Sequence, residues 1–171
     1  VSVLQRTEMV RRIAEEVEGY IIELGVDGRL VRLQLEELIG GLDDDRRLVI
    51  QDYFHEDGSW HLGEALEALS ELSTDDLLDL KAVAAALHLP GSGTDLDANL
   101  TARGFRLLAK VPRLPETVID SIVERFGTLQ KVMRASIDDL DDVKDVGGTR
   151  ARAIKEGLAR LAETSILDRY S

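Results

Sequence analysis

The sequence predicts an all-α protein in two parts, an acidic helical bundle and a compact domain built from a repeated helical unit. Apolar residues recur at three- and four-residue spacing along most of the chain, which is the period of an amphipathic helix. The final part repeats itself at an offset of 32 residues. Residues 1–100 carry 8 Lys or Arg against 22 Asp or Glu, whereas residues 101–171 carry 13 against 11.

The first part contains a series of expected helices. An apolar stripe from Val10 to Leu24 predicts a helix that ends near Gly25. Asp27-Gly28 predicts a turn, and Leu30–Ile39 predicts a second helix, although the alternation in RLVRLQL leaves a strand open. Further helices are expected over Asp43–Phe54, His61–Leu72 and Asp75–Leu87, the last with Ser73 or Thr74 as its N-cap.

A linker is predicted at LPGSGTDLDANL, Leu89–Leu100, where proline, glycine and polar residues separate two helical patterns. The domain boundary is placed within it, with residues 1–92 as an acidic helical linker domain and residues 93–171 as the second domain. GSGT is not interpreted as a phosphate loop, because no Gly-Lys-Ser/Thr follows it and no strand precedes it.

Composition restricts the class of function. The chain has no cysteine, which excludes disulfides, thiolate metal ligands and cysteine nucleophiles. No apolar run approaches the roughly 20 residues of a membrane span, and Val1–Thr7 lacks the features of a signal peptide. A soluble, cytoplasmic protein without membrane contact is therefore expected. An acidic first part repels a polyanion, so only the second part is suited to bind nucleic acid.

Two copies of one small helical unit are predicted in the second part. LLAKVPRLPETVIDSIVERFGTL lies over LDDVKDVGGTRARAIKEGLARL when Leu108 is aligned with Leu140 and Ile122 with Ile154. Each copy is a helix end, a tight turn and a new helix, with short helices expected between them at Leu129–Arg134 and Ile137–Leu140. The copies should pack on each other, because one copy is too small to bury its apolar side alone.

The second turn has the features of a phosphate site. Gly147 and Gly148 permit an unusual backbone path and the close approach of a ligand. The N–H groups that follow lie at a helix N-terminus, where unpaired donors and the helix dipole favour an oxyanion. Such a site holds a phosphate without reading a base. The predicted DNA contacts are Lys110, Arg113 and Leu114 in the first copy, and Lys144, Val146, Gly147, Gly148, Thr149, Arg150, Arg152 and Lys155 in the second.

This arrangement resembles the helix-hairpin-helix motif, whose hairpin usually reads Gly-hydrophobic-Gly. In the second copy, Asp145, Val146 and Gly147 occupy those three positions. In the first copy they are Arg113, Leu114 and Pro115, so both glycines are replaced and Pro115 has no N–H to offer a phosphate. Asp145 places a carboxylate beside the expected phosphate. The fold that the resemblance implies is a helical linker bundle followed by a compact tandem helix-hairpin-helix domain.

The order of the parts resembles the DisA family, the bacterial DNA-integrity scanning diadenylate cyclases. The resemblance rests on RTEMVRRIAEEVEGYIIELGVDGRLVRLQLEEL, RGFRLLAKVPRLPETVIDSIVERFGTL and the RARAIKEGLARL and ILDRYS endings. It implies an intact octameric parent, a nucleotidyltransferase that uses ATP and a divalent metal to make cyclic di-AMP. It also implies binding of branched DNA such as a Holliday junction, which suppresses the cyclase in a DNA damage checkpoint, together with nucleoid association and DNA-repair proteins as partners.

The catalytic Asp-Gly-Ala and Arg-His-Arg sequences of that family do not occur here, so the chain looks like a fragment that starts inside the linker. No enzyme activity, catalytic residue or cofactor is expected of it. His55 with Glu56 and Asp57 matches no zinc spacing, so no metal site is predicted. Trp60 and Phe105 are expected to pack rather than to stack on bases.

Two functions stay open from the sequence. The leading hypothesis is sequence-independent, structure-selective DNA binding through backbone phosphates. The alternative is a helical assembly scaffold or protein-interaction module in which the hairpins are structural. A third possibility, retained cyclase activity, is expected to fail a direct assay with ATP and a divalent metal.

Overall fold

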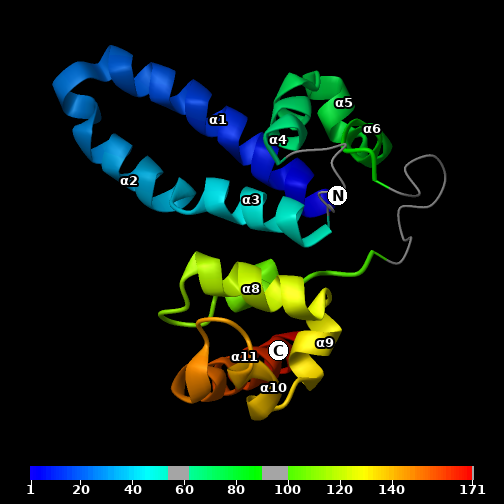
Figure 1. Ribbon diagram of the computed structural model, residues 1–171. Coiled ribbons are helices and arrows are strands. Elements are labelled where there is room, and N and C mark those ends of the chain that lie inside the picture. The colour runs from blue at the N-terminus through cyan, green and yellow to red at the C-terminus, as the bar shows by residue number, and fades with distance from the viewer. Residues whose placement is uncertain (54–61, 90–99, 171) are drawn as a thin grey trace. The chain divides into compact units, whose positions relative to one another are not determined.

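The computed structural model describes residues 1–53, 62–89 and 100–170 (Figure 1). These residues form helices and no strand, so the predicted all-α class is confirmed. They divide into two compact units. The first unit contains residues 1–50 and 62–89, and the second contains Gln51–Tyr53 and residues 100–170. The predicted boundary after residue 92 lies outside the described residues.

The first unit contains a long helical pair and a group of shorter helices. In Figure 1, α1 and α2 lie side by side and are joined by the short 3-10 turn η1, Gly25–Gly28. Because α2 is helical, the strand alternative for RLVRLQL is wrong. The helices are α1 (Ser2–Leu24), α2 (Arg29–Ile39), α3 (Leu42–Tyr53), α4 (Leu62–Glu71), α5 (Thr74–Leu78) and α6 (Leu80–Ala86).

Gly25 ends α1, as the sequence predicts. Its φ of 59° lies in the left-handed region, which glycine enters at little cost. The predicted N-cap at Ser73 is also present, because its hydroxyl accepts a hydrogen bond from the N–H of Asp76 at 3.0 Å.

The single helix predicted over Asp75–Leu87 is wrong, because the structure interrupts it at Asp79. This residue has an extended conformation, with φ −93° and ψ 112°, and its carboxylate accepts a hydrogen bond from the N–H of Lys81 at 2.9 Å. Aspartate side chains compete with the helical backbone in this way and favour N-caps over helix interiors. The segment therefore forms two short helices, α5 and α6.

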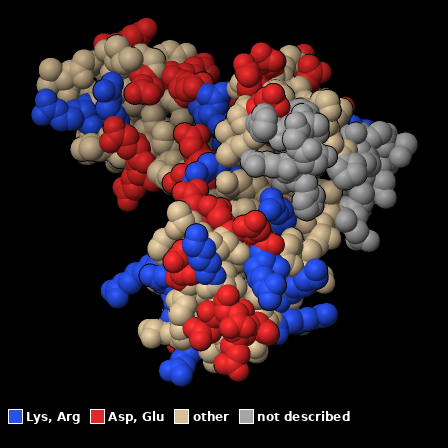
Figure 2. Space-filling view, in the orientation of Figure 1, with Lys and Arg blue, Asp and Glu red and all other residues tan. Residues whose placement is uncertain are grey.

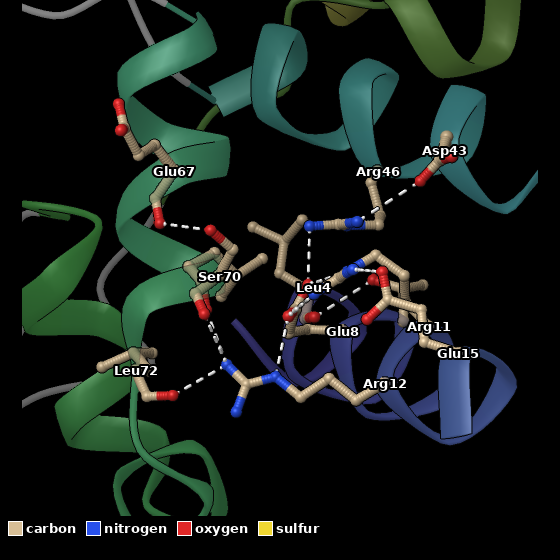
Figure 3. Close-up of polar contacts among 12 residues, drawn as sticks. Leu4, Glu8, Arg11, Arg12, Glu15, Asp43, Arg46, Glu67, Ser70 and Leu72 are labelled. Carbon is tan, nitrogen blue, oxygen red and sulfur yellow. Dashed lines mark hydrogen bonds and ion pairs between the residues drawn. The ribbon is translucent and has the colours of Figure 1, made fainter. Parts of the chain in front are cut away.

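A buried carboxylate organises the first unit (Figure 3). The Glu8 side chain is fully buried, and Arg11, Arg12 and Arg46 donate to its two oxygens at 2.8, 2.9 and 2.6 Å. Burial alone raises the pKa of Glu8, but the hydrogen bonds from Arg11 and Arg12 and the charge of Arg46 bring that pKa below its ordinary value. Glu8 is therefore a stable anion.

Arg12 extends this network to α4. Its Nη2 donates to the backbone oxygens of Leu69, Ser70 and Leu72 at 3.2, 3.1 and 2.8 Å (Figure 3). These carbonyls lie at or just after the C-terminal end of α4, where backbone acceptors lack intrahelical partners and a cation is favourable. The network thus joins α1, α3 and α4.

The second unit is built from the repeated helices. They are α7 (Phe105–Leu108), α8 (Glu116–Phe126), α9 (Leu129–Arg134), α10 (Ile137–Asp141) and α11 (Gly147–Tyr170). The short helix predicted over Leu129–Arg134 is present with the same bounds, and the one predicted over Ile137–Leu140 extends by one residue. Equivalent apolar residues of the two copies, such as Leu108 with Leu140 and Ile122 with Ile154, are fully buried.

Close contact between the copies depends on Gly157 in α11. A methyl group at this position would lie 3.2 Å from both methyl carbons of Val111, which precedes the first turn and is 3% exposed. Because both methyls are equally close, rotation of the Val111 side chain offers little relief. Gly157 therefore lets α11 approach the first copy.

We expect Glu8→Gln to destabilise the first unit at pH 7 by about 3 kcal/mol, since it leaves three arginines without their shared anion. The depressed pKa of Glu8 means that its stabilisation is present above its unfolded pKa, roughly 4.3, and is lost as the pH falls through the folded value. Denaturant unfolding at pH 7 and in steps below pH 4.5 checks this. Glu15→Gln, which removes an exposed partner of Arg11, is the matched control and should change little. A constant stability difference down to pH 3 would contradict the assignment.

We expect Gly157→Leu to destabilise the second unit by about 2 kcal/mol, because overpacking against Val111 outweighs the better helix propensity of leucine. Thermal unfolding followed by circular dichroism measures the change. Ala153→Leu, on an exposed position of the same helix, is the control. Equal unfolding temperatures for the two variants would show that the contact is not tight.

Candidate nucleic-acid interface

The 32-residue offset of the sequence is also the offset of the backbone hydrogen bonds. The N–H of Leu108 donates to the Gly104 oxygen at 3.0 Å, and that of Leu140 donates to the Ser136 oxygen at 3.2 Å. Further along, Val111 donates to Leu108 at 2.9 Å. Val143 donates to Leu140 at 3.1 Å in the same manner. The two copies therefore reach their turns along the same backbone path.

Both turns contain a left-handed residue at the first glycine position of the hairpin pattern. Arg113 has φ 62° and Asp145 has φ 65°. Such angles are uncommon for residues other than glycine, although aspartate tolerates them better than most. The second glycine position differs between the copies, because Gly147 has φ 65° and Pro115 has φ −65°. The copies thus share the start of the turn but not its end.

The second turn exposes the beginning of α11. Gly147 and Thr149 are exposed and Gly148 is half-buried. The first N–H groups of a helix have no intrahelical acceptor, so those of α11 are available to an anion. A side chain at Gly147 would meet open space, so glycine is favoured there by the backbone angle rather than by crowding. Val146 is 4% exposed and anchors the turn in the core.

The cations of the second copy differ in their contacts. The Arg150 guanidinium donates to the backbone oxygen of Asp145 and so closes the turn on itself. The Lys155 ammonium is half-buried and donates to the backbone oxygen of Met133 at 3.0 Å, which joins α11 to the end of α9. Lys144 and Arg152 are exposed. Of the predicted contacts, Lys155 and Val146 therefore also take part in the packing of the unit, and their contact with DNA stays a prediction.

The first turn can contact a phosphate mainly through cationic side chains and less through backbone N–H groups. Lys110 and Arg113 are exposed, and Leu114 is half-buried. Pro115 is the N-cap of α8 and makes no side-chain capping bond. Because proline has no N–H, this helix N-terminus has fewer donors for a phosphate than that of α11.

The distribution of charge separates the two units (Figure 2). On the face shown in Figure 2, acidic side chains gather on the first unit, while cationic side chains project from the second unit, which also carries acidic side chains. The exposed cations predicted as DNA contacts are Lys110, Arg113, Lys144, Arg150 and Arg152. Each of the two copies therefore contributes exposed cations near its turn.

Sequence reasoning missed the capping groups that hold the helices before the turns. Ser136 and Asp139 form a capping box at the start of α10. Their Ser-x-x-Asp spacing is a local pattern from which the sequence could have predicted this box. Asp52 caps α7 from a position about 50 residues earlier, so no local pattern reveals it.

The described residues cover only some of the other features considered in the sequence. Within residues 1–53, 62–89 and 100–170, no group of three His, Cys, Asp or Glu residues could hold a metal ion. The described part of the chain also contains no helix long and apolar enough to cross a membrane. Phe105 is 7% exposed and packs beneath the Arg103 guanidinium, 5.1 Å from its ring centre, so it is a packing residue as predicted. The His55 cluster, Trp60 and GSGT lie outside the described residues.

Comparison with known proteins identifies the family. The DisA bacterial checkpoint controller linker region matches residues 1–96. Over 99% of its length, the chain is 54% identical to the DNA integrity scanning protein DisA of Frankia alni and 55% identical to that of Streptomyces coelicolor. The chain therefore belongs to the DisA family. It spans about half the length of these curated relatives, 48% and 46% respectively.

Proposed function

We propose that this chain binds DNA through its second unit, independently of sequence, by contacts to backbone phosphates. The repeated left-handed turn carries the proposal: Arg113 and Asp145 are 32 residues apart and have nearly the same positive φ, 62° and 65°, and each turn leads into a helix N-terminus. Together with the exposed cations, this arrangement supports assignment of the two copies as helix-hairpin-helix motifs.

The chemistry of the two turns supports unequal phosphate contacts. At the second turn, the N–H groups after Gly147 and the positive end of the α11 dipole receive an oxyanion, and Lys144 and Arg152 add charge. At the first turn, Lys110 and Arg113 contribute mainly by charge. With so few contacts, we expect a dissociation constant on the order of 10⁻⁴ to 10⁻⁶ M at physiological salt.

Two phosphate sites fixed on one rigid unit favour DNA in which two backbone segments lie at the matching separation. Branched DNA, such as a recombination junction, presents more such pairs than linear duplex does, and it is the preferred ligand in this proposal. The name DNA integrity scanning protein, given to the relatives, agrees with this role.

In the longer parent protein, this chain is the DNA-sensing part. The parent makes cyclic di-AMP from ATP with a divalent metal, as an octamer in the bacterial cytoplasm associated with the nucleoid, and DNA-repair proteins are its further partners. Family membership is the support for these assignments.

A scaffold role is the second candidate, because the long helical pair exposes large apolar side chains. Val26 and Leu38 are 81% and 82% exposed, and Ile22 and Leu30 are each about two-thirds exposed. Apolar exposure of this kind is typical of an interaction surface. Light scattering distinguishes the candidates: a strictly monomeric chain that binds DNA excludes scaffolding as its main role.

A salt titration of binding to a four-way junction and to linear duplex tests the DNA proposal. We expect the logarithm of the binding constant to fall linearly with the logarithm of salt concentration, and the combined Lys144→Ala and Arg152→Ala changes to reduce that slope by about 2. Arg29→Ala with Arg32→Ala is the matched control, because it removes two exposed cations from the first unit and should leave the slope unchanged. Salt-insensitive binding, or equal slopes for both double variants, would overturn the proposal.

A further inference from the structure

The two copies cap the helix before the turn in different ways. In the second copy the cap is local: the Ser136 hydroxyl accepts from the N–H of Asp139 at 3.0 Å, and the Asp139 carboxylate accepts from the N–H of Ser136 at 2.8 Å. The equivalent position in the first copy is Gly104, which has no side chain to serve as a cap. Its φ of 120° is also one that other residues rarely adopt.

Asp52, in the last turn of α3, supplies the missing cap. One carboxylate oxygen accepts from the N–H groups of Gly104 and Phe105 at 2.7 and 2.6 Å, and the other accepts from Arg106 at 3.3 Å. The backbone oxygen of Asp52 also accepts from the N–H of Arg103 at 3.0 Å. Asp52 is only 3% exposed, and these contacts lie within the second unit, to which Gln51–Tyr53 belongs.

This cap matters because α7 has only four residues. A single helical turn does not persist by its own hydrogen bonds, since nucleation fixes several residues for one bond. Charge-assisted bonds from a buried carboxylate to its first N–H groups satisfy donors that the helix cannot pair. Burial of that carboxylate is in turn favourable only while the bonds are made.

The capped helix leads directly into the first turn. The N–H of Lys110 donates to Leu107 at 3.2 Å and that of Val111 donates to Leu108 at 2.9 Å, so the helical path continues to the residue before Pro112. Arg113 then takes its left-handed conformation. The direction of the Lys110 and Arg113 side chains therefore follows from the placement of α7.

We propose that Asp52 is the positioning residue of the first turn and fixes how Lys110 and Arg113 are presented to DNA. The DNA-binding unit is thus completed by residues about 50 positions before its main segment, and a division of the chain after residue 92 separates the turn from its cap. This inference rests on the proposed DNA binding, and its test distinguishes the two.

The test uses the full chain and a double-mutant cycle. Asp52→Ala removes the cap, and Asp52→Asn retains one amide oxygen for Gly104 and Phe105 but loses the charge. Asp44→Asn is the control, because Asp44 is exposed on the same helix and the change in net charge equals that of Asp52→Asn. Amide hydrogen exchange at Gly104 and Phe105 reports the cap, and binding of a four-way DNA junction reports the turn.

We expect Asp52→Ala to speed exchange at both amides and to weaken junction binding about fivefold, the scale of one or two weakened phosphate contacts. That loss should disappear when Lys110 and Arg113 are already alanine, and persist when Lys144 and Arg152 are alanine, because only coupled residues are non-additive. Asp52→Asn should restore part of the affinity, and Asp44→Asn should not weaken binding.

An equal loss in both backgrounds would overturn the inference, since it would indicate general destabilisation of the unit. Unchanged exchange at Gly104 and Phe105 in Asp52→Ala would overturn it as well. If the unaltered chain binds no DNA, the proposed function fails and with it the presentation of Lys110 and Arg113 to DNA, whereas faster exchange in Asp52→Ala still supports Asp52 as the cap of α7.

Discussion

The left-handed backbone at Arg113 and Asp145 is the constraint on which the second unit depends. Each residue reverses the chain within a few positions, so that the apolar faces of the helices before and after the turn meet. The strain of this conformation costs roughly 1 kcal/mol at a residue other than glycine. Burial of the paired leucines and valines of the two copies offsets that cost, and Gly157 lets the copies approach closely enough for it to do so.

The two units use their cationic side chains differently. In the first unit, Glu8 is buried among Arg11, Arg12 and Arg46, and this network uses three of the few cations in an acidic sequence to join helices. The exposed surface of that unit is left predominantly acidic, which disfavours contact with a polyanion. In the second unit the cations beside the turns stay exposed, so the proposed DNA contact is assigned to that unit. The chain that carries this division belongs to the DisA family.

Features with local causes were predictable from the sequence. The stop at Gly25, the cap at Ser73, the helix over Leu129–Arg134 and the 32-residue repeat each depend on residues close together in the chain. The break at Asp79 was missed because its helix-competing side chain lies within a strong apolar period. The charge of Lys155 predicts a DNA contact, whereas its bond to the backbone oxygen of Met133 depends on tertiary packing and has no local signal in the sequence. The cap that Asp52 provides for α7 also depends on tertiary packing, because Asp52 and α7 are about 50 residues apart in the sequence.

Mapping backbone amide chemical shifts during titration with a four-way DNA junction tests most directly whether both turns contact DNA. We expect the largest changes at Gly147 to Arg150, smaller changes at the first turn from Lys110 to Leu114, where Pro112 and the following Pro115 have no N–H donor, and little change along α1 and α2. The changes should disappear together as salt is raised. Shifts concentrated on the first unit, or confined to one turn while the other stays unaffected, would contradict a paired phosphate-binding role.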